Sequence, residues 1–386
     1  MKKDANPYAK SIPFTKQALS QMELRLLAES GLEESVASGG QNTKECCELI
    51  LRTTGADFSS LVPSCTSGLE AIFLALGIGA GDEVIMPSFT FPSTANAVAL
   101  RGAVPVFVDI KRDTMNIDEK HIQRAINKKT KAIVVVHYAG VAANMDSIME
   151  IANQYKLPII EDAAQCFGAK YGDRHLGSIG LAGAFSFHYT KNISCGEGGA
   201  IVTSDVSFND KLRVVLEKGT NRDAFLNNEV SKYQWIELGS SFLLSEISAA
   251  VLLGQLKTWQ TLTAERINRW NYYYEAFRSI NSSQLRLPKI TPKATHNGHI
   301  FYFHVCDPST RSKLISQLKL RGIQATTHFE PLHNSIAGKK YGRQVGSLIT
   351  TEEESATLVR LPLWNKIDSL EQDRIISAVC EILDIV

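Results

Sequence analysis

Two residues of this sequence have the types and positions that could hold an aldehyde and a ring nitrogen. Asp162 ends the apolar run LPIIED, and Lys191 lies in AFSFHYTKN, just ahead of the glycine-rich CGEGGA. A lysine amine forms a Schiff base with an aldehyde cofactor, and a carboxylate beside a pyridine nitrogen keeps that nitrogen protonated. The pair therefore predicts a site for pyridoxal 5′-phosphate (PLP), although a capping Asp or a surface Lys would explain either residue alone.

Hydroxyl-bearing residues lie where an expected strand turns into a helix. In VPSCTSGLEAIFLALG, Thr66 and Ser67 are at this turn, and backbone N–H groups at a helix start form an anion site with hydroxyls beside them. An ordinary Ser or Thr helix cap is a common alternative explanation. Ser186, five residues before Lys191, is either a further hydroxyl for a cofactor phosphate or a small core residue.

Two more residues could contact a pyridine ring. Phe89 follows a strand in MPSFTFPSTAN, where an aromatic side chain could cover the ring. Gln165 follows Asp162 by three residues and could reach the phenolic oxygen of the cofactor. Core packing is the usual fate of a Phe and solvation that of a Gln, so neither residue predicts the cofactor by itself.

The elements that must position these residues are apolar runs that alternate with helical patterns between about residues 60 and 205. The expected strands are SSLVPS, EVIMPS, VPVFVDI, KAIVVVH, LPIIED, AFSFH and AIVTS, and the expected helices are SGLEAIFLALG, STANAVALRG, IDEKHIQRAIN and MDSIMEIANQY. This alternation predicts a mostly parallel sheet covered by helices on both faces. Ligands bind beyond the carboxyl ends of such strands, which is where Asp162 and Lys191 fall.

After residue 240 the pattern changes. Residues 245–277 have the pattern of one long helix or two consecutive helices, HIFYFHV alternates like a half-buried strand, and STRSKLISQLKLRG predicts a helix that closes on Gly322. We therefore expect a large α/β domain over residues 1–250 and a smaller α+β domain over residues 251–386.

The composition excludes several classes of protein. Of 386 residues, 44% are hydrophobic and 21% charged, which is typical of a globular chain. The 41 Lys and Arg nearly cancel the 40 Asp and Glu, so no basic field exists to attract nucleic acid or an anionic membrane. No window has the apolar length of a membrane span or a signal peptide. We expect a cytoplasmic protein whose partners are small molecules or copies of itself.

Other cofactor and metal motifs are not supported. The seven cysteines are scattered without a C-x-x-C pair, which indicates reduced thiols and not a zinc site. GIGAGDEV precedes an expected strand, whereas a dinucleotide-binding loop follows one. His328 and His333 are five apart on an expected loop, and Glu330 is the one carboxylate between them; this set predicts no metal site.

Taken in order, the segments of this chain are similar to those of a known family. They are PSCTSGLEA, PSFTFPSTANAVALRGAVPVFVDI, DTMNID, VHYAGVAANMD, EDAAQ, SFHYTKN, GEGGA, LGSSFLLSEISAA and HFEPLH. From about Ile12 to the C-terminus, the chain resembles the sugar aminotransferases of the DegT/DnrJ/EryC1/StrS family. The resemblance implies the type I aspartate-aminotransferase fold with a mostly parallel seven-stranded sheet, PLP as cofactor, and a homodimer with shared active sites.

Within that family, VHYAGVAANMD, EKGTNR and LGSS most resemble enzymes of surface-glycan pathways, such as those of O-antigen lipopolysaccharide and enterobacterial common antigen. Those enzymes move the amino group of L-glutamate to C4 of a dTDP-linked 4-keto-6-deoxy sugar. The implied conversion is of dTDP-4-dehydro-6-deoxy-D-glucose to dTDP-4-amino-4,6-dideoxy-D-galactose. Amination at C3, or formation of the gluco epimer, remains an alternative.

The resemblance also implies a role for each matching residue. Lys191 would form the Schiff base, and Asp162 would bind the pyridinium nitrogen. Phe89 would stack on the ring face, and Gln165 would contact the phenolic oxygen. Thr66, Ser67 and Ser186 would hold the phosphate.

One segment departs from the family pattern. Many members have G-Y-N-Y-R, whose Asn reaches the cofactor phosphate of the partner subunit. This chain has G-S-S-F-L, with Ser241 at the Asn position and Leu243 at the Arg position. A serine can still donate a hydrogen bond over a shorter reach, so Ser241 is the expected phosphate contact across the dimer.

The substrate contacts are expected from charged and aromatic residues of the same segments. Arg222 of KGTNR, with Lys218 before it, could bind a diphosphate because Arg binds phosphate in a bidentate manner. A solvated charged loop explains these two residues equally well. His188 and Tyr189, beside the lysine, and His328 of the smaller domain are expected to face the substrate.

Three other functions compete with an aminotransferase. Related sugar dehydratases resemble this chain but have a His at the lysine position, so Lys191 argues against dehydration. A PLP-binding paralogue without turnover would not require Lys191 and Asp162 together. A structural protein would leave the polar residues at the strand ends unexplained.

Overall fold

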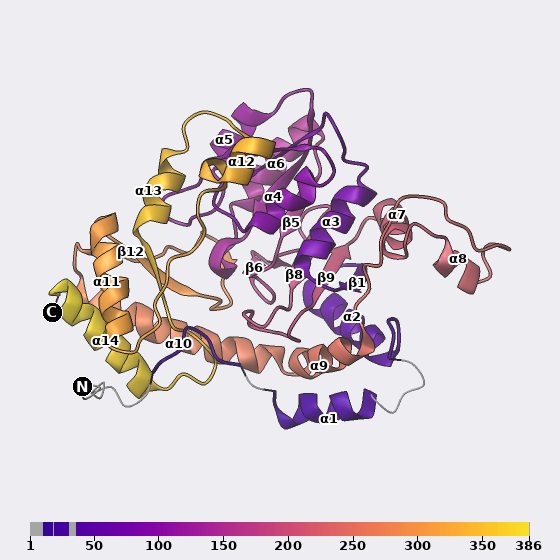
Figure 1. Cartoon of the computed structure of the whole chain (residues 1–386). Helices are drawn as coiled ribbons and strands as arrows, with labels where there is room; N and C mark the ends of the chain where they lie inside the picture. The colour runs from indigo at the N-terminus through magenta and orange to yellow at the C-terminus, as the bar shows by residue number, and fades with distance from the viewer. Residues whose placement is uncertain (1–10, 18, 31–35, 386) are drawn as a thin grey trace, which may run out of the picture.

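The computed structural model describes residues 11–17, 19–30 and 36–385. Its main sheet has eight strands (Figure 1), which run across the sheet in the order β1 (Phe58–Val62), β9 (Gly199–Thr203), β8 (Ala182–Ser186), β5 (Ile159–Asp162), β4 (Thr130–Val136), β2 (Glu83–Pro87), β3 (Val104–Val108) and β13 (Arg343–Gln344). Neighbouring strands are parallel except on the two sides of β9. All seven expected strands form. The sheet has one strand more than the expected seven, because β13, from the C-terminal part, pairs with β3.

Helices cover both faces of this sheet, as the apolar runs predict. On β4, Ile133 and Val135 belong to one hydrophobic core, whereas Ala132 and Val134 belong to the other, because successive side chains of a strand point to opposite faces. The first core is closed by α2 (Gln41–Thr54), α5 (Glu119–Ala125), α6 (Met145–Tyr155) and α9 (Glu246–Lys257). The second is closed by α3 (Cys65–Ala75), α4 (Pro92–Ala99) and α7 (Val206–Leu216).

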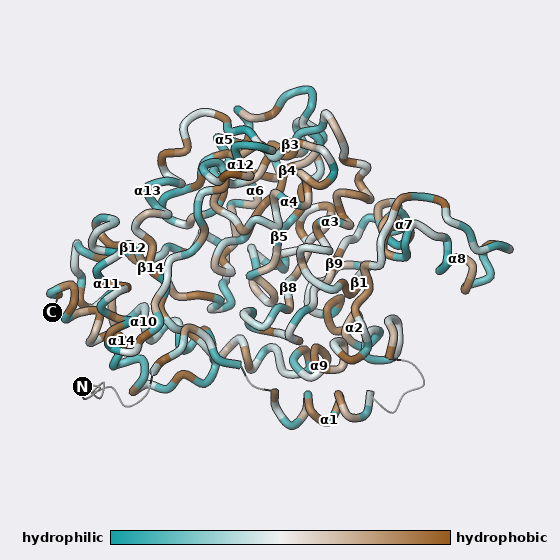
Figure 2. The backbone as a smooth tube through the Cα atoms, in the orientation of Figure 1, coloured by the Kyte–Doolittle hydropathy of each residue, from teal (hydrophilic) through white to brown (hydrophobic). Residues whose placement is uncertain are grey.

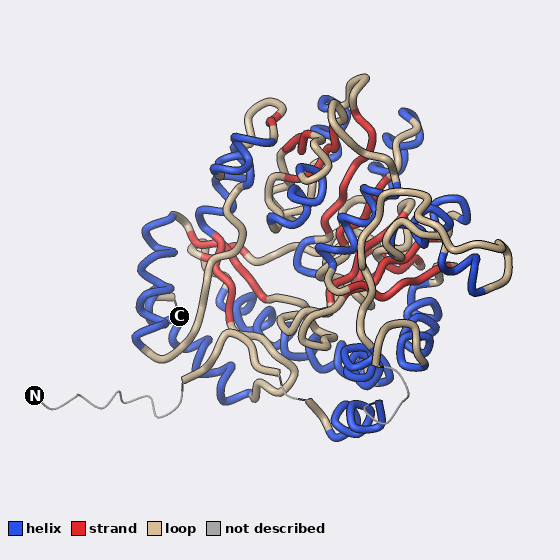
Figure 3. Tube along the Cα trace, turned by 45° about the vertical axis from the view of Figure 1, so that its right-hand side comes forward, coloured by secondary structure: helices blue, strands red, loops and turns tan. Residues whose placement is uncertain are grey.

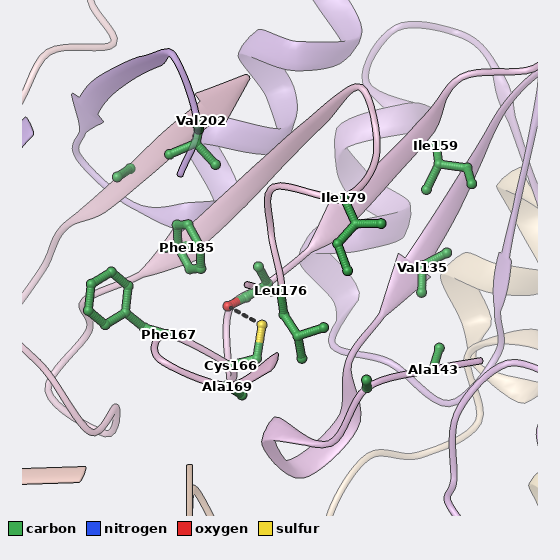
Figure 4. Close-up of a cluster of buried hydrophobic side chains, with 14 of the residues drawn as sticks. Val135, Ala143, Ile159, Cys166, Phe167, Ala169, Leu176, Ile179, Phe185 and Val202 are labelled. Carbon is green, nitrogen blue, oxygen red and sulfur yellow. Dashed lines mark hydrogen bonds between the residues drawn. The ribbon is translucent and has the colours of Figure 1, made fainter. Parts of the chain in front are cut away.

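The first core shows how the strands share one apolar face (Figure 4). Val135, Ile159, Phe185 and Val202 project from four neighbouring strands into it. Cys166 lies in the same cluster, and its thiol donates a hydrogen bond of 3.4 Å to a backbone carbonyl of its own turn. Cys166 therefore fills space as a small apolar residue, and none of the seven cysteines forms a disulfide.

The C-terminal part forms a separate core around an antiparallel sheet, β10-β12-β14, whose strands lie apart from those of the main sheet (Figure 3). Residues 245–277 form two helices, α9 and α10 (Trp259–Ile280), which are separated at Thr258. The other elements of this core are β10 (Leu285–Arg286), β12 (Phe301–Val305), β14 (Leu358–Leu361), α11 (Pro308–Leu320), α13 (Ile349–Thr357) and α14 (Ser369–Leu383). The end expected for α11 at Gly322 is confirmed, since Gly322 follows the helix with a φ of +75°.

The expectation that β12 is half-buried is wrong. All five of its residues are buried, because Phe301 and Phe303 pack in the C-terminal core while Tyr302 faces a small aromatic cluster against the large sheet. Residues before the first helix join the same core: Ile12 is buried in it and bonds through its backbone to Gly322. The domain boundary near residue 250 stays a prediction.

The remaining elements are short and lie around these two cores. They are α1 (Gln21–Ser30), η1 (Tyr138–Gly140), β6 (Lys170–Tyr171), β7 (Arg174–His175), α8 (Arg222–Leu226), β11 (Ala294–Thr295), η2 (Leu332–Asn334) and α12 (Ile336–Tyr341). Hydrophobic and hydrophilic residues alternate along the outer helices (Figure 2). Among the described residues, no helix has the length and apolar character needed to cross a bilayer.

A buried carboxylate anchors the strand that ends at Asp162. Glu161 is fully buried and accepts backbone N–H bonds from Gly177 (2.7 Å), Ile179 (2.6 Å) and Gly180 (2.7 Å). It also accepts a bond of 2.8 Å from His137 Nε2, whose Nδ1 accepts the N–H of residue 143. Burial alone would raise the pKa of Glu161, but the His137 and backbone donors hold it below its ordinary value.

Replacing this carboxylate is expected to destabilise the fold. Glu161→Gln should lower the free energy of unfolding by about 3–5 kcal/mol, because it leaves buried N–H donors without their charged acceptor. Urea unfolding followed by circular dichroism measures the change, and Glu150→Gln on the exposed face of α6 is the matched control.

The same contact has a pH signature. Since the folded-state pKa lies below the ordinary 4.5, the stabilisation is present above that pH and is lost as the pH falls through the lowered value. The difference in unfolding free energy between wild type and Glu161→Gln should therefore shrink in acid. An equal stability of the two proteins at neutral pH would contradict the anchoring role.

Candidate active site

A cavity of about 700 Å³ lies at the carboxyl ends of the central strands, between the main sheet and the C-terminal core. It is bordered by the ends of β4, β5 and β8 on one side and by residues of β14 on the other. Seven of the residues singled out in the sequence line it, namely Thr66, Asp162, Gln165, Ser186, His188, Lys191 and His328. The structure thus brings Asp162 and Lys191 to one cavity.

Asp162 faces this cavity because it alternates with Glu161 at the end of β5. Its Oδ2 accepts a hydrogen bond of 2.7 Å from Thr94 Oγ1, and its Oδ1 accepts one of 3.2 Å from the N–H of residue 164. The thiol of Cys65 lies 3.9 Å from Oδ1. No Lys or Arg forms an ion pair with Asp162 among the described residues, so this carboxylate is available to a cationic ring nitrogen.

Lys191 lies on a tight turn after β8. Its N–H donates to the carbonyl of His188 (2.8 Å), and its carbonyl accepts a bond of 2.6 Å from Gln17 Nε2. Burial lowers the pKa of the Lys191 amine, while Cys65 and Asp162 act in the opposite direction. A lowered pKa increases the neutral fraction of the amine, which is the form that attacks a carbonyl or removes a proton.

The start of α3 forms the hydroxyl-rich end of the cavity. Ser64 caps the helix by accepting the N–H of Ser67 (3.0 Å), and the two hydroxyls lie 2.9 Å apart. Ser67 is therefore engaged in the cap and does not line the cavity. The Thr66 hydroxyl lies 2.7 Å from that of Ser93, and the cavity-lining hydroxyls at this end come from Ser64, Thr66, Ser93 and Ser186.

A glycine allows β9 to approach this helix start. A Cβ on Gly199 would lie 2.6 Å from the backbone nitrogen of Cys65, so a larger residue would push the strand and the helix apart. The glycine-rich segment after Lys191 thus packs against the turn that carries Thr66. N–H groups and hydroxyls at a helix N-terminus suit a phosphate, so the donor set at this end fits the phosphate of PLP.

Gln165 is oriented by a backbone contact. Its side chain is buried, and its Oε1 accepts a bond of 2.7 Å from the N–H of Ala139. The carbonyl end of the amide is thereby fixed, which leaves the Nε2 donors toward the cavity that Gln165 lines. An N–H donor at this position fits the phenolic oxygen of PLP.

Five predicted residues do not line the cavity. Ser67 and Phe89 lie behind its wall, and Tyr189, Arg222 and Ser241 lie outside it. Phe89 is only 1% exposed and packs edge-on against Tyr138 at 5.1 Å. The aromatic residue that reaches the cavity from this strand end is Phe91, two positions later, so the structure does not place Phe89 at the cavity as the sequence predicts.

Arg222 lies on α8 and pairs with Glu217 at 3.2 Å. Ser241 is exposed and forms a backbone β-bridge with Glu217. Tyr189 is half exposed and packs on His188, with the ring centroids 4.5 Å apart. Within a single chain, these three residues therefore contribute nothing to the cavity.

Several cavity residues were missed by the sequence reasoning. Arg266 is buried and bonds only to backbone carbonyls, with Nη2 donating to His299 at 2.6 Å, and burial lowers the pKa of its guanidinium to about 10. His299 donates from Nδ1 to Asn192 Oδ1 (3.0 Å). Burial first, and then the charges of Lys191 and Arg266, lower the pKa of His299 well below its ordinary value.

Arg360 and Phe14 also line the cavity without having been predicted. They come from the two ends of the described chain, and the guanidinium of Arg360 lies 4.8 Å from the centroid of the Phe14 ring. No spacing in the sequence indicates this pairing, because it depends on how the N-terminal segment crosses the C-terminal core. Among the described residues, no three His, Cys, Asp or Glu side chains converge to form a metal site.

Comparison with known proteins identifies the family of this chain. Residues 19–380 match the DegT/DnrJ/EryC1/StrS aminotransferase family. Among solved structures, S. venezuelae DesV is 30% identical, with 96% of this chain and 98% of that chain covered and a TM-score of 0.87. An aminotransferase of this family from Brucella abortus is 29% identical (93% and 95% covered, TM-score 0.85). TlmJ from Streptoalloteichus hindustanus is 25% identical (97% and 99% covered, TM-score 0.89).

The fold, the cavity and these matches define the protein as a PLP-dependent aminotransferase. The chain belongs to the DegT/DnrJ/EryC1/StrS aminotransferase family. The predicted α/β fold with a mostly parallel large sheet, the predicted cofactor and the predicted enzyme class are thereby confirmed.

The Lys191 amine is expected to titrate below an ordinary lysine in the cofactor-free protein. Burial lowers its pKa from 10.5, so at a given pH a larger fraction is neutral and reactive. Acetic anhydride labelling across a pH series, quantified by mass spectrometry, gives the midpoint for each lysine. Exposed Lys44 on α2 is the comparison, and a Lys191 midpoint at or above 10.5 would contradict the expectation.

Proposed function

We propose that this aminotransferase moves the amino group of L-glutamate to C4 of a nucleotide-linked 4-keto-6-deoxy sugar. The proposed conversion is of dTDP-4-dehydro-6-deoxy-D-glucose to dTDP-4-amino-4,6-dideoxy-D-galactose, for surface-glycan biosynthesis. The observation that carries the transaminase chemistry is the meeting of Asp162 and Lys191 in one cavity beside the hydroxyl-rich start of α3. The choice of sugar is supported by the segments VHYAGVAANMD, EKGTNR and LGSS.

Different residues of the cavity would contact different parts of the cofactor. Asp162 would bind the pyridine nitrogen, Gln165 the phenolic oxygen and Phe91 one face of the ring. Thr66 and Ser186, with the N–H groups at the start of α3, would hold the phosphate. When bound, PLP supplies an aldehyde that condenses with amines and a protonated ring that withdraws electrons from a neighbouring carbon.

Lys191 would do the proton transfer. Its neutral amine would remove the proton from Cα of L-glutamate. L-glutamate leaves as 2-oxoglutarate after its nitrogen has been transferred, with water supplying the new keto oxygen. In the second half of the reaction, the protonated Lys191 would deliver a proton to C4 of the sugar, whose keto oxygen leaves as water, and the transferred nitrogen leaves on the product. The lowered pKa of Lys191 favours this role, because a general base must be unprotonated at the working pH.

Removal of Lys191 is expected to abolish transamination. Lys191→Ala loses both the covalent attachment point for PLP and the proton-transfer group, so the rate should fall by about 10⁴-fold or more. Incubation with L-glutamate and dTDP-4-dehydro-6-deoxy-D-glucose, with NMR analysis of the aminated sugar, measures activity and product together. Borohydride reduction should fix PLP on the wild type and not on the variant.

The control for that experiment is Lys211→Ala on the exposed side of α7, which should retain wild-type activity. Full activity of Lys191→Ala would refute the assignment of the base. A wild-type product aminated at C3, or with gluco configuration, would keep the aminotransferase and refute the proposed substrate specificity.

We also propose that the enzyme is a homodimer that shares its active sites. The segment around α8 projects from the body of the molecule (Figure 1). Large apolar side chains of this segment are exposed, namely Phe225, Leu226, Val230, Tyr233, Trp235, Ile236 and Leu238. A second copy is the proposed cover for them, and Ser241 and Arg222, which do not line their own cavity, would then serve the cavity of the partner.

Charge placed in this segment should dissociate the dimer. Trp235 is 74% exposed, and Trp235→Asp would put a charge where the partner is proposed to bury the indole, which costs several kcal/mol without a counter-ion. Light scattering after gel filtration should give two chains per particle for the wild type and one for the variant. Leu370→Asp on α14, also exposed, should remain dimeric, and a dimeric Trp235→Asp would contradict the proposed interface.

A further inference from the structure

One histidine of the cavity is held by a buried tyrosine. The hydroxyl of Tyr138 lies 2.7 Å from His328 Nδ1. Tyr138 is 1% exposed, and its hydroxyl has no other hydrogen-bond partner among the described residues. His328 itself lines the cavity, whereas Tyr138 lies behind it.

The burial of Tyr138 decides which atom donates. If His328 Nδ1 carried the proton, the phenol hydrogen would be buried without an acceptor, at a cost of about 1–3 kcal/mol. The hydroxyl therefore donates and Nδ1 accepts, which places the imidazole proton on Nε2. Burial raises the pKa of Tyr138, so the phenol keeps its proton.

His328 stays neutral in this arrangement. Burial first, and then the charges of Arg360 and Lys191, lower the pKa of the ring well below its ordinary value. The other titratable group that faces it is His299, which acts in the same direction. Nδ1 already accepts the hydrogen bond of Tyr138. The ring therefore presents an N–H donor at Nε2 to the cavity and has no free ring nitrogen that could act as a base.

The orientation of the ring is fixed by aromatic neighbours. Phe329 stacks on His328 with the centroids 3.7 Å apart and the planes inclined by 26°. Phe89 meets the His328 ring edge-on, with the centroids 6.3 Å apart. Phe89 also packs edge-on against Tyr138, with the centroids 5.1 Å apart. This arrangement gives Phe89 a packing role behind the cavity and leaves His328 little freedom to rotate.

A cation without a carboxylate partner lies on the same wall. The N–H of Arg360 bonds to Thr326, and its Nε donates to the carbonyl of Thr327 (2.9 Å), so Arg360 is tied to the segment that carries His328. Its terminal nitrogens have no hydrogen-bond or ion-pair partner among the described residues. Its side chain lines the cavity and stacks on Phe14.

We propose that Arg360 and the Nε2–H of His328 form a receptor for an anionic group of the substrate, and that Tyr138 is the positioning residue that fixes His328 as a donor. This inference rests on the proposed function, because both of its substrates are anions. The receptor takes a carboxylate of L-glutamate or the diphosphate of the sugar nucleotide. The charge of the cavity suits either group, since Arg266 and Arg360 both line it and neither pairs with a carboxylate among the described residues.

The test is binding of inert anions to the PLP-loaded enzyme by isothermal titration calorimetry. Glutarate probes for a carboxylate and dTDP for a diphosphate. His328→Leu should weaken binding of at least one probe by about 10- to 150-fold, the range for a hydrogen bond to a charged group. His328→Gln, which can place an amide N–H near the position of Nε2, should recover much of that loss. Arg360→Met should weaken binding of the same probe at least as strongly as His328→Leu does. Arg360→Lys should weaken it less than Arg360→Met does.

Tyr138→Phe keeps the ring in the aromatic cluster and removes only the hydroxyl. It should weaken the same probe by about 2- to 12-fold, the range for a neutral hydrogen bond. In kinetics of the two half-reactions, the KM for the substrate whose anionic group binds the receptor (L-glutamate or the keto sugar) should rise. The kcat should change by less than about 2-fold. A merely structural role would instead lower thermal stability and kcat together.

The probe that weakens identifies the source of the anion. Arg124→Met on the exposed face of α5 is the control and should bind both probes like the wild type. Unchanged affinity for both probes in Arg360→Met and His328→Leu would overturn the receptor. Unchanged affinity in Tyr138→Phe, together with a loss in His328→Leu, would overturn the positioning role. Failure of L-glutamate to convert the wild-type cofactor would refute the proposed function separately, since the binding measurements do not depend on turnover.

Discussion

The buried carboxylate of Glu161 is the contact on which the site depends. Four donors surround it, and one of them belongs to His137 at the end of the neighbouring strand, β4. A fully buried charge is tolerated only when its hydrogen bonds are complete, so the loop 177–180 and the ends of β4 and β5 have few alternative arrangements. Alternation along β5 then directs the next side chain, Asp162, to the opposite face, where the cavity lies.

The rest of the cavity is built by segments that are distant in the sequence. Gln17 binds the carbonyl of Lys191, and the same N-terminal segment contributes Phe14, which packs on Arg360 of β14. The C-terminal core therefore supplies the cationic wall, with Arg266 and Arg360, and the main sheet supplies the wall with Asp162 and Ser186. Substrate anion and cofactor ring can be held by different walls because the two cores meet at the carboxyl ends of the strands.

The sequence predicts those parts of the site that are local to strand ends. Asp162, Lys191, Thr66 and Ser186 could be placed because each follows or ends an apolar run, and such positions in a parallel sheet converge at one edge. Phe89 also follows a strand end, but it does not line the cavity. Beyond the last residue of β2, alternation no longer fixes the direction of a side chain, and here Phe91 reaches the cavity while Phe89 turns into the aromatic cluster.

Arg266, Arg360 and His299 could not be predicted in this way. Each is placed by tertiary packing between α10, β12 and β14. Arg266 is buried and Arg360 is half-buried, although Arg usually lies at the surface. Arg266 is satisfied by three backbone carbonyls and Arg360 by one carbonyl and an aromatic face.

A guanidinium that forms no ion pair keeps its charge effective inside the cavity, because no carboxylate neutralises it. Two such cations attract an anionic substrate. Burial is the largest cause of the lowered pKa of His299 and His328; Arg360 lowers the pKa of both, and Arg266 lowers that of His299. His299 and His328 are thereby held as neutral hydrogen-bonding groups. This leaves the proton transfer to Lys191 in the proposed mechanism.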